Sequence, residues 1–113
     1  MLDCRHMTKI NKELLKGSSD IIILAVLASE PLYGYEIAKR IKSQSTNILA
    51  MGEGTLYPLL HRLEKAHLLE SFWKEIDGRK RKYYGLTSAG KKILSEKTAE
   101  WGEFTKAMNA IVH

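Results

Sequence analysis

The spacing of apolar residues along the chain predicts a series of helices, beginning close to the N-terminus. Residues 8–16 place their apolar side chains on one side, which predicts a short helix that Gly17 would end. A second helix is expected to begin near residue 20, after residues that suit a helix N-terminus, and to stop before Pro31. Residues 21–28 are apolar nearly all round, so we expect this helix to be buried.

Two more helices are predicted in the middle of the chain. The first begins at about residue 33, with Ile37 and Ile41 in an apolar stripe and basic residues on the opposite side. Residues 45–52 are expected to form a loop, in which residues 48–51 could make a very short strand. The second helix covers about residues 53–66, because leucines recur there at helical spacing. Its expected core positions are Leu56, Leu59, Leu60 and Leu63.

The hydrophobic pattern then changes from a helical period to an alternating one. Residues 69–86 contain two β-prone runs on either side of Asp77 and Gly78, a pair that strongly favours a hairpin turn. Thr87 or Ser88 is then placed to cap a last helix that extends to about residue 112. A heptad-like series of large apolar side chains within it predicts a face that needs a partner. This series comprises Leu94, Trp101, Phe104, Met108 and Ile111.

The order of these elements is helix, helix, helix, hairpin and long helix, which describes a winged helix-turn-helix. We therefore expect a mainly α protein with a small β-hairpin, in the α+β class. Residues 1–17 would form an N-terminal segment, residues 18–86 the winged helix-turn-helix domain, and residues 87–113 a dimerisation helix. A chain of 113 residues fits one domain with a small core, which favours oligomerisation.

Charge and composition narrow the class of partner. The chain has 18 Lys and Arg residues against 13 Asp and Glu residues, a formal net charge of +5, which suits nucleic acid or a membrane surface. The longest apolar run is too short to cross a bilayer, and no signal peptide is recognisable. Cys4 is the only cysteine, so no internal disulfide can form. We therefore expect a cytoplasmic protein without a membrane partner.

The helix expected at about residues 53–66 has the features of a recognition helix. In a helix-turn-helix, the second helix enters the major groove of DNA, and its N-terminal residues contact base edges. The stretch "GEGTLYP" places small residues at the helix head, where backbone N–H groups can approach phosphate. Pro58 should distort the helix if it begins as early as residue 53. The side chains expected to face DNA are Tyr57, His61, Arg62 and Lys65, although Tyr57 also fits a buried core position.

The hairpin supplies a second basic surface. Its turn is followed by four consecutive cations, Arg79, Lys80, Arg81 and Lys82, which can enter a minor groove or contact phosphates. Phosphate contacts fix the register of a protein on DNA, whereas the base sequence has to be read by the helix. A charge run at a turn is otherwise simply solvated, so it is the order of the elements that indicates DNA.

Three stretches of the chain together resemble the PadR family of transcriptional regulators. They are "LYGYEIAKRI", "EGTLYPLLHRLEKAHLL" and "GRKRKYYGLTSAGKKIL", and the similarity extends over about residues 18–96. The resemblance implies a homodimeric winged-helix protein that binds DNA, usually as a repressor, and dimerises largely through its C-terminal helix. It also implies DNA contacts for Tyr33, Tyr35, Thr55, Tyr57, Pro58, Gly78, Arg79, Lys80, Arg81 and Lys82.

Two positions depart from the pattern of that family. His67 stands where glycine is usual after "RLEK", and the left-handed conformation that ends a helix would cost histidine roughly 1 kcal/mol. Gly85 follows the two tyrosines where a longer residue is common. We expect this glycine to weaken or bend its strand.

The apolar face of the last helix has no partner nearby in the sequence. A second copy of the helix would cover this face about a two-fold axis. The same axis would place two recognition helices roughly 34 Å apart, which predicts a palindromic operator. Some members of the resembled family respond to phenolic acids or planar drugs, so paired Trp101 side chains could hold a planar aromatic effector. The alternative is that Trp101 only packs in the interface.

Other chemistry has little support in the sequence. Cys4 and His6 are too few for a metal site, and Cys4 has no second cysteine for a redox switch. No nucleophile–base set or paired carboxylates occur, so we expect neither a cofactor nor catalysis. Two alternatives to DNA binding are a winged-helix module that binds proteins and a protein that sequesters a ligand. The basic face around His61 and Arg62 favours DNA over a protein partner.

Overall fold

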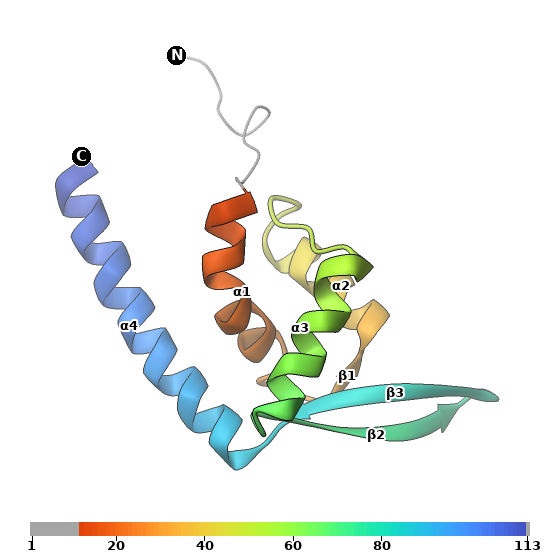
Figure 1. Ribbon diagram of the computed structural model, residues 1–113. Coiled ribbons are helices and arrows are strands. Elements are labelled where there is room, and N and C mark those ends of the chain that lie inside the picture. The colour runs from red at the N-terminus through yellow and green to blue at the C-terminus, as the bar shows by residue number, and fades with distance from the viewer. Residues whose placement is uncertain (1–11, 113) are drawn as a thin grey trace.

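The computed structural model describes the backbone of residues 12–112 and the side chains from residue 17 onwards. Four helices and three strands lie within this range (Figure 1). In chain order they are α1 (Lys12–Val26), β1 (Leu32–Tyr33), α2 (Gly34–Gln44), α3 (Glu53–Lys65), β2 (Leu69–Ile76), β3 (Arg79–Leu86) and α4 (Ser88–Val112). The expected mainly α architecture with a small sheet, a winged helix-turn-helix, is confirmed.

The core lies where α1, α2 and α3 meet one face of the sheet. Burying one aliphatic side chain stabilises a fold by about 1.5–3 kcal/mol, so a cluster of them holds the three helices together. α3 contributes four buried leucines, which are the four that its helical spacing predicted. The cluster includes Ile23, Leu24, Ile37, Ile41, Leu56, Leu59, Leu60, Leu63 and Leu69.

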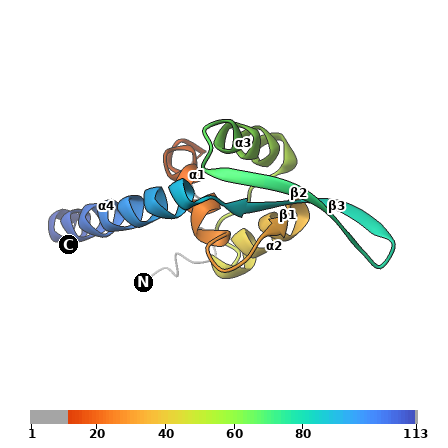
Figure 2. The ribbon, with the colours of Figure 1, turned by 90° about the horizontal axis from the view of Figure 1, so that it is seen from below.

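The sheet is antiparallel and has the strand order β1–β3–β2. β2 and β3 form the predicted hairpin, in which Ile76 pairs with Arg79 across a two-residue turn. The turn residues Asp77 and Gly78 have positive φ values of 52° and 74°, as a tight hairpin turn of this kind requires. β1 pairs only with Tyr83 and Tyr84, so the outer half of the hairpin extends beyond it as a wing (Figure 2).

Gly17 does not end a helix, and the prediction of a new helix near residue 20 is wrong. α1 is continuous from Lys12 to Val26, with Gly17 in its interior. A glycine inside a helix weakens it by about 1 kcal/mol but does not stop it, and the buried side chains that follow offset that loss. Residues 8–11, the first part of the predicted short helix, lie outside the described residues.

The prediction of a strand at residues 48–51 is also wrong. Thr46 and Asn47 have positive φ values of 55° and 65°, so the chain turns there. The backbone N–H of Leu49 donates a 2.9 Å hydrogen bond to Ser45 Oγ, which holds the turn. The short strand is β1 instead, and it depends on pairing with β3, which lies far away in the sequence.

The two departures from the family pattern have different outcomes. His67 has a φ of 63°, the left-handed conformation expected after the end of α3. β3 is not interrupted at Gly85, which pairs with Glu70 in register. A Cβ atom on Gly85 would lie 3.3 Å from Pro31 Cγ, so this glycine makes room for the proline.

α4 leaves the rest of the molecule on the side opposite the wing (Figures 1 and 2). Thr87 caps it, because Thr87 Oγ1 accepts a 2.9 Å hydrogen bond from the backbone N–H of Gly90. The first turns pack on the core through Ile93 and Leu94, whereas Phe104 further along is 53% exposed. The radius of gyration is 15.6 Å, against about 13 Å for a compact domain of this length. Most of α4 is therefore uncovered within one chain.

Candidate nucleic-acid interface

The buried leucines of α3 decide which of its side chains face outwards. Successive residues of a helix are rotated by about 100°, so the side opposite the leucines carries Pro58, His61 and Lys65, all exposed. Tyr57 lies on the flank towards the sheet, and Arg62 lies on the flank towards α1. The outward face of α3 therefore divides into a centre and two flanks with different neighbours.

Pro58 lies in the second turn of α3, because the helix begins at Glu53 with Gly52 as its N-cap. A proline there cannot donate to the carbonyl group of Gly54, four residues earlier. The helix nevertheless continues to Lys65. Gly54 and Pro58 are both exposed, so this carbonyl group can accept a hydrogen bond from outside the helix instead.

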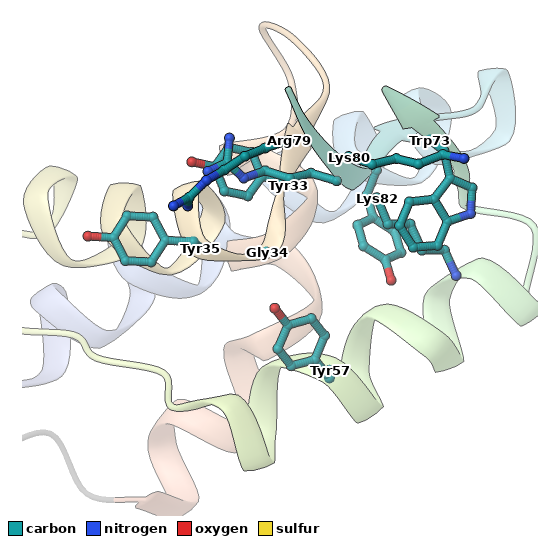
Figure 3. Close-up of a pocket in the computed structure, with 10 residues that line it drawn as sticks. Tyr33, Gly34, Tyr35, Tyr57, Trp73, Arg79, Lys80 and Lys82 are labelled. Atoms are coloured by element: carbon teal, nitrogen blue, oxygen red, sulfur yellow. The ribbon is translucent and has the colours of Figure 1, made fainter. Parts of the chain in front are cut away.

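A groove of about 540 Å³ lies between the head of α3, the start of α2 and the wing (Figure 3). Five aromatic residues and four cations line it, and no carboxylate is among the lining residues. The lining consists of Tyr33, Gly34, Tyr35, Tyr57, Trp73, Arg79, Lys80, Arg81, Lys82 and Tyr84. Tyr57 is 44% exposed, which excludes the alternative that it is a core residue. The groove is thus concave, aromatic and positively charged.

The four cations after the turn reach the groove from both faces of the wing, because side chains alternate between the two faces of a strand. Trp73 pairs with Lys82 on the face towards α3, and Lys74 pairs with Arg81 on the other face. The position of Lys82 on the face towards α3 is shown by its ion pair, in which its Nζ atom lies 4.0 Å from a carboxylate oxygen of Glu64 in α3. The wing therefore presents cations on both of its faces.

The cations also differ in how far they are already engaged. The Arg81 guanidinium carbon lies 4.5 Å from the ring centroid of Tyr33, and Lys82 Nζ lies 5.6 Å from that of Tyr84. Arg79 and Lys80, next to the turn, make no ion pair within the part of the chain that the structure describes. These two side chains are the ones free to meet an external anion.

Tyr84 forms a buried, neutral part of the groove. Its burial raises the pKa of its hydroxyl group above the ordinary value, although the nearby Lys82 opposes this effect. The hydroxyl therefore stays protonated at neutral pH and can donate a hydrogen bond. The groove gains no negative charge from this residue.

Arg62 does not belong to the groove. Its guanidinium group donates hydrogen bonds of 2.7 Å and 3.4 Å to the two carboxylate oxygens of Asp20 in α1. The pKa of Arg62 is raised, chiefly by this hydrogen bond and then by the charge of Asp20.

Five other residues that were expected to contact DNA also lie outside the groove, and all of them are exposed. They are Thr55, Pro58, His61, Lys65 and Gly78.

Sequence reasoning did not include three residues of the groove, Gly34, Trp73 and Tyr84. Trp73 had a usable signal, because counting back from the two-residue turn pairs it with Lys82. Tyr84 had the same signal, because it lies two residues beyond Lys82 and therefore on the same face of β3. Gly34 had none, since it meets Tyr57 only through the packing of α2 against α3.

The residues expected in a dimer interface fall into two groups. Leu94 packs against the core of its own chain. The others are exposed along the outer part of α4, where Trp101 and Phe104 have ring centroids 6.0 Å apart. These exposed residues are Trp101, Phe104, Met108 and Ile111.

Metal and membrane chemistry have no support in the described part of the chain. Cys4 and His6 lie outside the described residues, and the described residues contain no group of three or more His, Cys, Asp or Glu side chains suited to a metal. No helix within residues 12–112 is both long and apolar enough to cross a bilayer.

The chain is similar to known proteins over most of its length. The model of the transcriptional regulator PadR-like family matches residues 23–96. An uncharacterised protein of Lysinibacillus sphaericus is 40% identical over 95 residues, which are 83% of this chain and 87% of that protein. The transcriptional regulator Rv3488 of Mycobacterium tuberculosis is 33% identical over 85 residues, 75% of this chain and 77% of that protein. A solved transcriptional regulator from Clostridium thermocellum, 34% identical, matches with a TM-score of 0.82 over 90% of this chain and 100% of that one. The family, the Mycobacterium tuberculosis relative and the Clostridium thermocellum structure are transcriptional regulators rather than enzymes.

Proposed function

Because the chain belongs to the PadR-like family of transcriptional regulators, we propose that it is a homodimeric repressor that binds a palindromic operator. α3 enters the major groove of double-stranded DNA, and the wing contacts the adjacent backbone or minor groove. Thr55, Tyr57, Pro58, His61 and Lys65 face the bases and their phosphates. Residues 18–86 then act as the DNA-binding part and residues 87–113 as the dimerisation helix.

The observation that carries this proposal is the charge and shape of the groove between α3 and the wing. Four cations and five aromatic residues line it, without a carboxylate among them. A backbone of phosphates and sugars offers both anionic and apolar surface to such a groove. Arg79 and Lys80 are not engaged in ion pairs with described residues, so binding phosphate does not require breaking one.

The exposed apolar face of α4 supports the dimer. A helix with Trp101, Phe104 and Met108 roughly half exposed leaves a large apolar surface in water, which an equivalent helix from a second chain would cover. A two-fold axis through that contact would present two α3 helices to two half-sites of an operator.

The same face supports release by an effector. Trp101 and Phe104 lie side by side at an interplanar angle of 34°, and they would meet their counterparts across the two-fold axis. A planar aromatic molecule between them would change the spacing of the two α3 helices, provided that it prefers one arrangement of the dimer. The simpler alternative is that these rings only pack against one another.

Selection of bound sequences from a random duplex pool, followed by salt titration, tests the function. We expect an enriched palindrome. The double variant Arg79→Ala/Lys80→Ala should weaken binding to all duplexes and reduce the slope of log affinity against log salt by about 0.9 for each phosphate that is no longer neutralised. Lys91→Ala/Lys92→Ala removes two exposed cations from the start of α4 and is the matched control.

Two results would contradict the proposal. Equal reductions of affinity in both double variants would mean that only net charge matters and that the wing makes no specific contact. Failure of the unmodified protein to bind any duplex at low salt would favour a winged-helix module that binds proteins.

A further inference from the structure

Gly34, the first residue of α2, is buried and lies against the hydroxyl end of the Tyr57 ring (Figure 3). A Cβ atom at this position would overlap the hydroxyl oxygen of Tyr57 and would lie 2.8 Å and 2.9 Å from its Cζ and Cε1 atoms. Real side chains essentially never approach so closely. The ring of Tyr57 can therefore occupy its place only because residue 34 has no side chain.

Backbone conformation does not explain this glycine. Among the described glycines only Gly78 has a positive φ, so any L-residue could adopt the conformation of Gly34. At a helix position alanine is intrinsically favoured over glycine. Gly52 and Gly54, at the head of α3, have no atom within 4 Å of an added Cβ. The close contact with Tyr57, and not the backbone conformation, therefore accounts for a glycine at position 34.

We propose that Gly34 is a positioning residue for Tyr57, an inference that rests on the DNA-binding function proposed above. The flat backbone at the head of α2 lets the ring of Tyr57 lie inwards against it, with the other side of the ring turned to the groove. A side chain at residue 34 pushes the ring outwards, into the space that DNA is proposed to occupy. Tyrosine has only two side-chain torsions, so a ring supported on one side presents its hydroxyl group in a well-defined place.

A double-mutant cycle on duplex binding tests this coupling. We expect Gly34→Ala to weaken affinity for the selected operator about tenfold when Tyr57 is present, and less than about twofold when Tyr57 is replaced by alanine. Measurements at low salt keep the binding of the Tyr57→Ala protein within range, because phosphate contacts are then strongest. Gly17→Ala is the matched control, since its added Cβ would meet no atom within 4 Å.

Two measurements without DNA separate this inference from the function on which it rests. Nuclear Overhauser contacts between the α protons of Gly34 and the ring protons of Tyr57 should appear in the free protein. Thermal unfolding should show that Gly34→Ala does not lower the melting temperature in the Tyr57→Ala background, because the three atoms nearest to the added Cβ all belong to the Tyr57 side chain.

The outcomes are distinct. Absent ring contacts, or equal reductions of affinity with and without Tyr57, would overturn the role of Gly34, whatever the protein binds. Ring contacts in a protein that binds no duplex would instead uphold the placement of Tyr57 and overturn the DNA-binding function.

Discussion

The hydroxyl group of Thr87 donates a 2.7 Å hydrogen bond to the carbonyl oxygen of His67, which joins the end of α3 to the beginning of α4. The backbone N–H of Thr87 adds a 3.1 Å bond to the carbonyl oxygen of Leu68. Gly90 completes this joint, because an added Cβ would overlap that same Leu68 oxygen. These contacts of Thr87 and Gly90 with His67 and Leu68 therefore fix the direction of α4 relative to α3. In a dimer formed through α4, that direction would set the distance between the two α3 helices.

Thr87→Ala should lower the free energy of unfolding by about 1–2 kcal/mol, because it removes the N-cap of α4 and the bond to His67 together. Chemical denaturation would measure the loss. Thr87→Ser keeps a hydroxyl group and is the matched control, for which we expect a clearly smaller loss. Equal losses of stability for the two variants would mean that the hydroxyl group is not what stabilises the joint.

Gly90→Ala should destabilise the fold by about 1–3 kcal/mol, because backbone atoms of Leu68 have to move to admit the methyl group. Gly102→Ala is the control in the same helix, since nothing lies within 4 Å of its added Cβ. That change should be neutral or stabilising by up to about 1 kcal/mol in thermal unfolding. A tolerated Gly90→Ala would contradict the close packing of α4 on Leu68.

His67→Gly should stabilise the protein by about 1 kcal/mol, because glycine adopts a φ of 63° without steric cost. His67→Ala retains a Cβ atom and should give no such gain. Denaturant titrations of the three proteins would provide the comparison. A gain for alanine equal to that for glycine would assign the effect to the imidazole ring rather than to the backbone.

Phe104→Glu should shift the protein towards monomer and raise the dimer dissociation constant at least about tenfold, because it places a charge within the exposed apolar face. Sedimentation equilibrium at several concentrations would measure this constant. Lys106→Glu introduces the same side chain on the opposite side of α4 and should leave dimerisation intact. A monomeric unmodified protein at micromolar concentration would contradict the dimer itself.

Arg62→Gln should reduce duplex affinity less than Arg79→Gln, because Arg62 is held by Asp20 and lies outside the groove. Its side chain is 60% exposed, so breaking the ion pair should cost only about 0–1 kcal/mol of stability. Binding isotherms at one salt concentration would rank the two variants. The reverse ranking would mean that Arg62 leaves Asp20 to contact DNA.

Local sequence pattern was enough to predict α2, α3 and α4, the hairpin and the run of cations after its turn. The leucine spacing of α3 identified its buried side, and Asp77 with Gly78 identified the turn of the hairpin. These features depend on residues within a few positions of one another, so helical periodicity and turn chemistry reveal them. The same locality explains two errors, since Gly17 looked like a helix end and residues 48–51 like a strand.

Contacts between segments that lie far apart in the sequence could be identified only from the tertiary structure. Packing of α2 against α3 brings Gly34 against Tyr57, and pairing of β1 with β3 adds Tyr33 to the groove. Packing of α1 beside α3 ties Arg62 to Asp20. The hydrophobic periodicity of the sequence does not predict such contacts, because they depend on the angles and separations at which whole helices and strands pack around the core. The amino-acid pattern thus specified the elements and the positive charge, and tertiary packing selected which charged and aromatic side chains share one groove.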